Sequence, residues 1–128
     1  MGRTSRNKKP KYKIRNFESG KTKDIFATIY ADMIQSQAWK ELTNNARVLY
    51  IYMKLQYYGQ KPINEMEDYF YFNKAMYTKT YKLYTNVGQF YKDRDLLVKN
   101  GFIEIVGGST KTTREKMIYR YSDKWKEF

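Results

Sequence analysis

Two amide side chains, Asn86 and Gln89, stand three residues apart at the start of a segment in which Phe90, Leu97 and Val98 recur at helical spacing. The oxygen and nitrogen of an amide match the hydrogen-bonding edge of adenine in the major groove of DNA. On an isolated helix such amides more often contact only water, so the pair is informative only inside a DNA-binding motif. Turning the three apolar residues inward leaves a polar face outward. The residues of this segment expected to contact DNA are Thr85, Asn86, Gln89 and Lys92.

A second group of polar and cationic side chains lies between two segments that read as strands, 102–106 and 117–121. Gly107 and Gly108 favour a loop after the first strand, so the two strands are expected to form a hairpin with this group at its tip. Such a loop can follow a phosphate backbone or enter a minor groove, although ordinary hairpin tips also collect charged residues. The expected DNA contacts in this wing are Lys111, Thr112, Arg114 and Lys116.

Positive charge is concentrated at the start of the chain. Residues 1–23 hold nine Lys or Arg against one Glu, a net charge of +8, whereas the other 105 residues carry the remaining +4 of the total of +12. A segment of this composition buries too little apolar surface to order itself, so we predict a disordered basic tail over 1–23 and one domain over 24–128. The tail either tracks phosphates or is simply a solvated terminus. The expected phosphate contacts outside the helix and wing are Lys82, Arg3, Arg6, Lys8 and Lys9.

The elements that position these residues are predicted from caps and periodicity. Thr85 is the expected N-cap of the helix that Asn100-Gly101 ends, and Asn73 caps a brief helix over 74–79 just before it. Upstream, Ser36 caps a helix over 37–42 and Thr43 caps one over 44–58, while 25–30 and 69–72 have the composition of strands. A helix, a turn, a second helix and a hairpin in this order predict an α+β fold, a winged helix-turn-helix with a C-terminal β-hairpin wing.

The segment 44–58 is apolar nearly all the way round. A helix of this kind must be covered on several sides. The sequence therefore predicts a central core helix, or a core helix with one flank that forms a homodimer interface.

Composition excludes most enzyme chemistry. The chain has no Cys and no His, which removes disulfides, thiolate nucleophiles, imidazole bases and the usual zinc sites. Its acidic residues are scattered, apart from Glu65, Glu67 and Asp68 in a polar loop, so we expect neither catalysis nor a metal ion or cofactor. No apolar run approaches the ~18 residues of a membrane span, and the basic N-terminus lacks the apolar stretch of a signal peptide, so we expect a cytoplasmic protein.

Several strings also resemble a family. FATIYADMIQSQAWKELTNNARVLYIYM (26–53), FYFNKAMY (70–77), KNGFIEIV (99–106) and IYRYSDKW (118–125) are similar to the winged helix-turn-helix DNA-binding proteins of plasmids, integrative conjugative elements and phages of Gram-positive bacteria. The similarity covers roughly residues 24–126. It includes conjugation accessory proteins of the TcpK-like type.

The resemblance implies an accessory or regulatory protein of a mobile element, which binds double-stranded DNA in replication initiation, in transcription, or in a relaxosome at an origin of transfer. The implied partners are DNA, a second copy of the chain, and relaxase or replication proteins. One departure is that Asp93 and Arg94 stand where such helices bury an apolar pair, so either they form a local pair, or the helix is rotated or begins elsewhere, which would shift the outward residues. Two alternatives stay open: a protein-interaction module whose basic tail binds nucleic acid non-specifically, and RNA binding through the tail.

Overall fold

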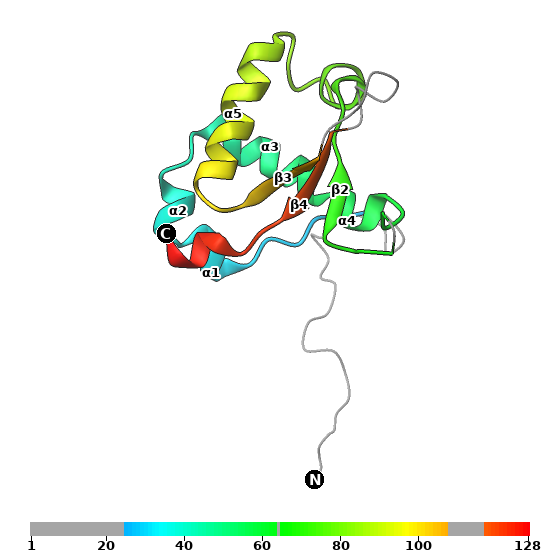
Figure 1. Cartoon of the computed structure of the whole chain (residues 1–128). Helices are drawn as coiled ribbons and strands as arrows, with labels where there is room; N and C mark the ends of the chain where they lie inside the picture. The colour runs from blue at the N-terminus through cyan, green and yellow to red at the C-terminus, as the bar shows by residue number, and fades with distance from the viewer. Residues whose placement is uncertain (1–24, 64, 108–116) are drawn as a thin grey trace, which may run out of the picture.

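The computed structural model describes residues 25–63, 65–107 and 117–128, which form a mixed α+β fold (Figure 1). The helical segments are α1 Ala31–Ile34, α2 Gln37–Lys40, α3 Asn44–Lys54, α4 Gln56–Gly59, the π-helical turn η1 Met76–Thr80, α5 Val87–Lys99 and the 3-10 turn η2 Lys124–Glu127. The strands are β2 Tyr69–Tyr71, β3 Ile103–Gly107 and β4 Ile118–Tyr121. The predicted tail and the tip of the predicted wing lie outside the described residues.

The three strands form one antiparallel sheet in the order β2-β4-β3. Tyr119 of β4 is in register with Phe70 of β2 on one side and Ile105 of β3 on the other. The Phe70 ring stacks on Tyr119 and Tyr121, with centroids 5.5 and 4.4 Å away. Cross-strand aromatic pairs of this kind fix the register of a sheet. The element order and the strand order are compatible with a winged helix, and the α+β class is confirmed.

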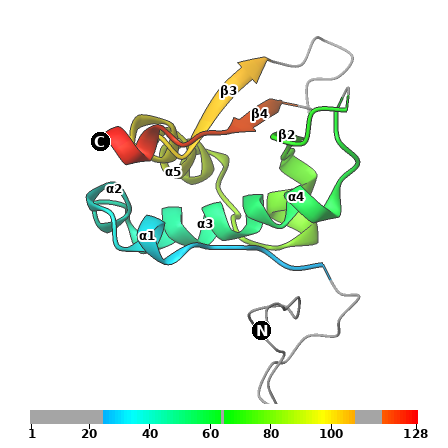
Figure 2. The same ribbon diagram turned by 90° about the horizontal axis from the view of Figure 1, so that it is seen from below.

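The core lies between the sheet and helices α3 and α5 (Figures 1 and 2). Leu49 and Met53 of α3, Leu97 of α5 and Phe102 at the start of the hairpin are fully buried there. Figure 2 shows α3 and α4 along one side of the sheet, with segment 25–30 along the far side of these helices. Helix 44–58 is therefore a core helix as predicted, and its hydrogen-bonded turns are interrupted at Leu55, between α3 and α4.

Three of the predicted caps are confirmed. The Oγ of Ser36 accepts from the Trp39 N–H at 3.2 Å, and the Oγ1 of Thr43 accepts from the Ala46 N–H at 3.2 Å. The Oδ1 of Asn73 accepts from the Met76 N–H at 3.0 Å. A short polar side chain satisfies an amide that has no partner in the first helical turn, so the local sequence is sufficient to start these helices.

Segment 25–30 is not a strand, which corrects the prediction from composition. It runs extended beside α4, where the Phe26 ring stacks on Tyr58 with centroids 5.0 Å apart. Ile25 lies 3.6 Å from the position that a Cβ on Gly59 would occupy. Its apolar side chains pack on a helix, so composition alone predicted the wrong class of secondary structure.

The end of α5 follows the prediction from Asn100-Gly101. The Asn100 Nδ2 donates to the carbonyl of Ala38 at 2.9 Å, which ties the end of α5 to α2. Gly101 has φ +91°, and a Cβ there would meet the backbone nitrogen of Trp125 at 2.5 Å. Glycine is required here both for the positive φ and for the close approach of η2.

Candidate nucleic-acid interface

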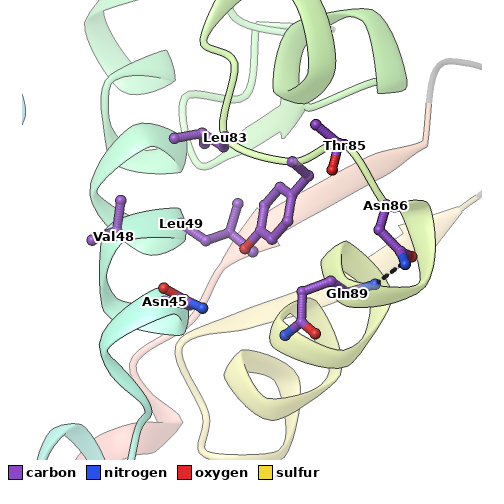
Figure 3. Close-up of a pocket in the computed structure, with 8 residues that line it drawn as sticks. Asn45, Val48, Leu49, Leu83, Thr85, Asn86 and Gln89 are labelled. Atoms are coloured by element: carbon purple, nitrogen blue, oxygen red, sulfur yellow. Dashed lines mark hydrogen bonds between the residues drawn. The ribbon is translucent and has the colours of Figure 1, made fainter.

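Helix α5 begins one residue later than predicted. Its N-cap is Asn86, not Thr85, and the Asn86 Oδ1 accepts from the Gln89 N–H at 3.2 Å (Figure 3). The preceding turn, residues 81–86, joins η1 to α5 and contains Lys82 in the left-handed region at φ +55°. Lys82, Thr85 and Asn86 are all exposed, so this turn presents one cation and two short polar side chains to solvent.

Helix α5 is rotated relative to the prediction. Its buried residues are Phe90, Asp93 and Leu97, whereas Val98 is only half-buried. At 100° per residue this moves the outward direction by about 45°, onto the exposed side chains of Tyr91, Lys92, Asp95 and Lys99. Gln89 therefore lies half-buried on a flank of the helix and not at its outward centre.

A buried carboxylate explains the rotation. Asp93 is 3% exposed, and its Oδ2 accepts from the Tyr84 hydroxyl at 2.6 Å while its Oδ1 accepts from the Gln89 Nε2 at 3.2 Å. Burial, and then the hydrogen bond to Asp93, raises the pKa of Tyr84. Arg94 does not pair with Asp93 but with its other neighbour, Asp95, at 2.9 Å. Asp93 and Arg94 therefore do not form a local pair: α5 begins one residue later than predicted and is rotated.

The flank of α5 that carries Gln89 faces α3 across a cavity of about 230 Å³ (Figure 3). The side chains of Asn45 and Gln89 point toward this space from opposite helices, and Leu49 and Leu83 also line it. A second hollow of about 410 Å³ shares these two amides and continues along α5 past Lys92. The Gln89 amide therefore makes polar contacts inside the domain, in addition to any contact that it makes at the surface.

Charge is distributed unevenly between the two sides of the domain. On the sheet, Arg120 contacts Asp68 at 3.1 Å and Glu104 at 3.5 Å, and Lys124 contacts Glu104 at 2.9 Å. Within the described ranges, no carboxylate lies at ion-pair distance from Lys82 or Lys92. Arg120 and Lys124 are therefore neutralised by the protein, whereas Lys82 of the turn and Lys92 of α5 are available to an anionic partner.

The remaining predicted site residues belong to the wing tip and the tail. Lys111, Thr112, Arg114, Lys116, Arg3, Arg6, Lys8 and Lys9 lie outside the residues that the structure describes. Of the described ones, Lys82, Thr85, Asn86 and Lys92 are exposed on the turn and on α5, and Gln89 is half-buried. Lys74 was not among the predicted site residues. It lines an aromatic cleft whose residues come from three elements, so their positions in the sequence gave no signal.

Comparison with known proteins gives no relative: no family model, no curated protein and no solved structure matches the chain. Within the described ranges, no helix has the length and apolarity needed to cross a membrane. The same residues contain no cluster of three or more acidic, His or Cys side chains placed to hold a metal ion.

Proposed function

We propose that the chain is a winged helix-turn-helix protein that binds specific sequences of double-stranded DNA, with α5 in the major groove. The observation that carries the proposal is the row of unpaired cations and polar side chains on the turn 81–86 and on the outward side of α5. In a winged helix the second helix of the motif enters the groove with its N-terminal residues toward the bases, and the hairpin lies beside it. Helix α5, β3 and β4 follow each other in that order.

The caps limit which atoms can read bases. Bidentate pairing with adenine needs both the oxygen and the nitrogen of an amide. The Asn86 oxygen already accepts from the Gln89 N–H, and the Gln89 nitrogen donates to Asp93. We therefore expect Asn86 to contact a base through its Nδ2 alone, Thr85 to add a hydroxyl, and Lys82 and Lys92 to contact phosphates.

The cellular role we propose is that of a non-enzymatic accessory factor of a mobile genetic element. The resemblance of its sequence strings supports this role, which covers conjugative transfer at an origin of transfer, replication initiation and transcriptional regulation. Each of these processes needs a protein that marks one DNA site. A relaxase or a replication protein is the partner expected at that site.

The experiment is a pull-down of fragmented DNA of the host element at about 150 mM salt, followed by sequencing and by salt titration of the best fragment. We expect one repeated motif. Lys92→Ala should weaken cognate and random duplexes about equally and lower the salt slope by about 1, while Asn86→Ala should reduce the preference for the cognate duplex. Lys61→Ala is the control, because this exposed lysine lies after α4, away from the turn and α5. Recovery of random fragments, with Lys92→Ala equal to Lys61→Ala, would contradict the proposal.

A protein-interaction role is the second candidate. Apolar side chains are exposed on α3, on α4 and on segment 25–30, and the ring pair Phe26–Tyr58 is about half exposed. They include Val48, Ile51, Phe26 and Tyr58. Surfaces of this kind mark contacts with other proteins, and a second copy of the chain is the simplest occupant. Sedimentation at micromolar concentration should give a dimer, and Ile51→Lys should give a monomer. A monomeric wild type, with and without DNA, would contradict the homodimer.

A further inference from the structure

A cleft of about 480 Å³ lies between η1, α5 and β4. Figure 1 shows η1, the N-terminal half of α5 and the start of β4 at the same end of the molecule. The side chains that give the cleft its chemistry are Lys74, Tyr77, Tyr91, Arg94 and Tyr119. A cleft of this size with few polar groups among aromatic walls is typical of ligand-binding sites.

The aromatic wall is rigid. The rings of Tyr77 and Phe90 stack with centroids 3.8 Å apart and an angle of 7° between their planes. At the rim, Tyr91 is 47% exposed, and the Arg94 guanidinium lies 4.7 Å from the centre of its ring. Asp95 accepts from the Arg94 Nε at 3.0 Å and from its Nη2 at 2.9 Å, which holds the guanidinium in place. Tyr91 and Arg94 thus form a preorganised flat surface at the mouth of the cleft.

One buried hydroxyl in the cleft has no partner. Tyr77 is 3% exposed, and within the described residues its hydroxyl makes no hydrogen bond, although the side chain lines the cleft. Burial raises the pKa of Tyr77 to about 12, and the nearby hydroxyls of Tyr91 and Tyr119 add to the rise while Arg94 opposes it. These groups are therefore close to one another. A hydroxyl that faces a cleft and has no protein partner among the described residues is free to bond to a ligand that enters the cleft.

The available groups define the ligand. Flat rings favour an aromatic ligand, the Tyr77 hydroxyl can pair with its polar edge, and the exposed Lys74 suits a phosphate attached to it. Arg94 is already paired with Asp95 and bonded to Tyr119, so it contributes its flat face and not a free charge. An isolated phosphate would use Lys74 and leave the rings and the Tyr77 hydroxyl without a function. In a paired duplex both faces of each base are covered by its neighbours, so a base can stack on Tyr91 only when it has left the helix.

We propose that the cleft between η1, α5 and β4 binds one unpaired nucleotide of a DNA strand, whose base stacks on the Tyr91–Arg94 surface and bonds to the Tyr77 hydroxyl. The inference rests on the proposed function, because it places this nucleotide beside the duplex held by α5. It adds a preference for DNA that is locally opened. Such a preference is what a factor acting at a site of strand separation needs.

The test compares three forms of the cognate duplex: fully paired, with one bulged thymidine, and with an abasic residue at the bulge. The full chain and its variants are titrated by fluorescence anisotropy. We expect the thymidine bulge to bind at least about fivefold more tightly than the paired duplex, the increment of one stacked base, and the abasic bulge to lose that gain. Tyr77→Phe should bind paired duplex normally and lose the gain. Tyr91→Ala, which alters the outward side of α5, should lose the difference between bulged and paired duplex whatever its affinity for the paired one. Tyr58→Phe is the control, because this exposed tyrosine on α4 lies outside the cleft.

The outcomes separate the two proposals. Paired-duplex binding without any preference for the thymidine bulge overturns the inference and leaves the proposed function standing. A preference that the abasic bulge shares overturns it as well, because the protein would then recognise a bent backbone. A preference that survives Tyr77→Phe and Tyr91→Ala assigns the base to another part of the chain and also overturns it. Absence of specific duplex binding contradicts the proposed function itself.

Discussion

Removal of the Tyr84 hydroxyl tests whether the buried carboxylate of Asp93 sets the position of α5. In Tyr84→Phe the ring remains, and the Oδ2 of Asp93 loses its 2.6 Å donor while the carboxylate stays 3% exposed. The only other side-chain donor to it among the described residues is the Gln89 amide at 3.2 Å. A hydrogen bond to a buried charged group contributes about 1.5–3 kcal/mol, and a distance this short belongs to the stronger class.

We therefore expect Tyr84→Phe to lower the free energy of unfolding by about 2–3 kcal/mol, a large part of the ~5–15 kcal/mol that a domain has. Urea unfolding followed by circular dichroism measures this change, with Tyr58→Phe as the control that should stay within about 0.5 kcal/mol. The double variant Tyr84→Phe/Asp93→Leu should recover part of the loss, because no charge is then left buried without its donor. A loss below about 0.5 kcal/mol for Tyr84→Phe would refute the reasoning, since Asp93 would then be satisfied without the phenol.

Three further predictions follow. Gly101→Ala should lower the free energy of unfolding in urea by about 2–4 kcal/mol, because a Cβ at this positive φ would meet backbone atoms of η2. Gly107→Ala, with open space around it, should change it by less than about 0.5 kcal/mol. Lys82→Gly should raise the free energy of unfolding by about 0.5–1 kcal/mol, because glycine adopts a φ of +55° without the strain that a lysine side chain causes. Lys79→Gly in η1 should lower it by about 1 kcal/mol. Equal effects of the two changes would show that Lys82 is not strained. Burial raises the pKa of several tyrosines above the unfolded value of about 10, so the native state retains protons that the unfolded chain releases. The free energy of unfolding should therefore fall as the pH rises above about 10, by about 1.4 kcal/mol per pH unit for each such group. A free energy of unfolding that stays constant from about pH 9 to 11 would contradict this. The tyrosines concerned are Tyr50, Tyr77, Tyr84, Tyr119 and Tyr121.

Local signals predicted the element starts well. The caps at Ser36, Thr43 and Asn73 need only their own side chain and the next turn, and all three are confirmed. Asn100-Gly101 ended α5 as predicted, because a positive φ at glycine is also a local property. The α+β class and the hairpin strands followed from the order of these signals.

The orientation of α5 could not be predicted in the same way. The prediction from helical spacing turned only apolar residues inward. In the structure Asp93 faces inward as well, because the Tyr84 hydroxyl makes the burial of its carboxylate favourable. The same limitation hid the cleft, whose members come from η1, α5 and β4 and meet only through the tertiary fold. The π-helical turn was also missed, since the Tyr81 N–H reaches the Met76 carbonyl instead of making the usual bond one residue closer.

The cap of α5 restricts how the specificity of such a protein can diverge. Because Asn86 both begins the helix and faces the expected groove, a substitution that changes base preference also changes the stability of the helix start. Replacement of a capping side chain by a non-capping one lowers the free energy of unfolding by about 1 kcal/mol. Long side chains that could contact bases, such as those of Arg or Gln, would therefore destabilise the helix start at this position. Of the residues that cap well through a side chain, Asp is repelled by phosphates, which leaves Ser, Thr and Asn. If the proposed function holds, related proteins should therefore vary at Thr85 before they vary at the cap, and their binding sites should diverge first at the base that Thr85 contacts.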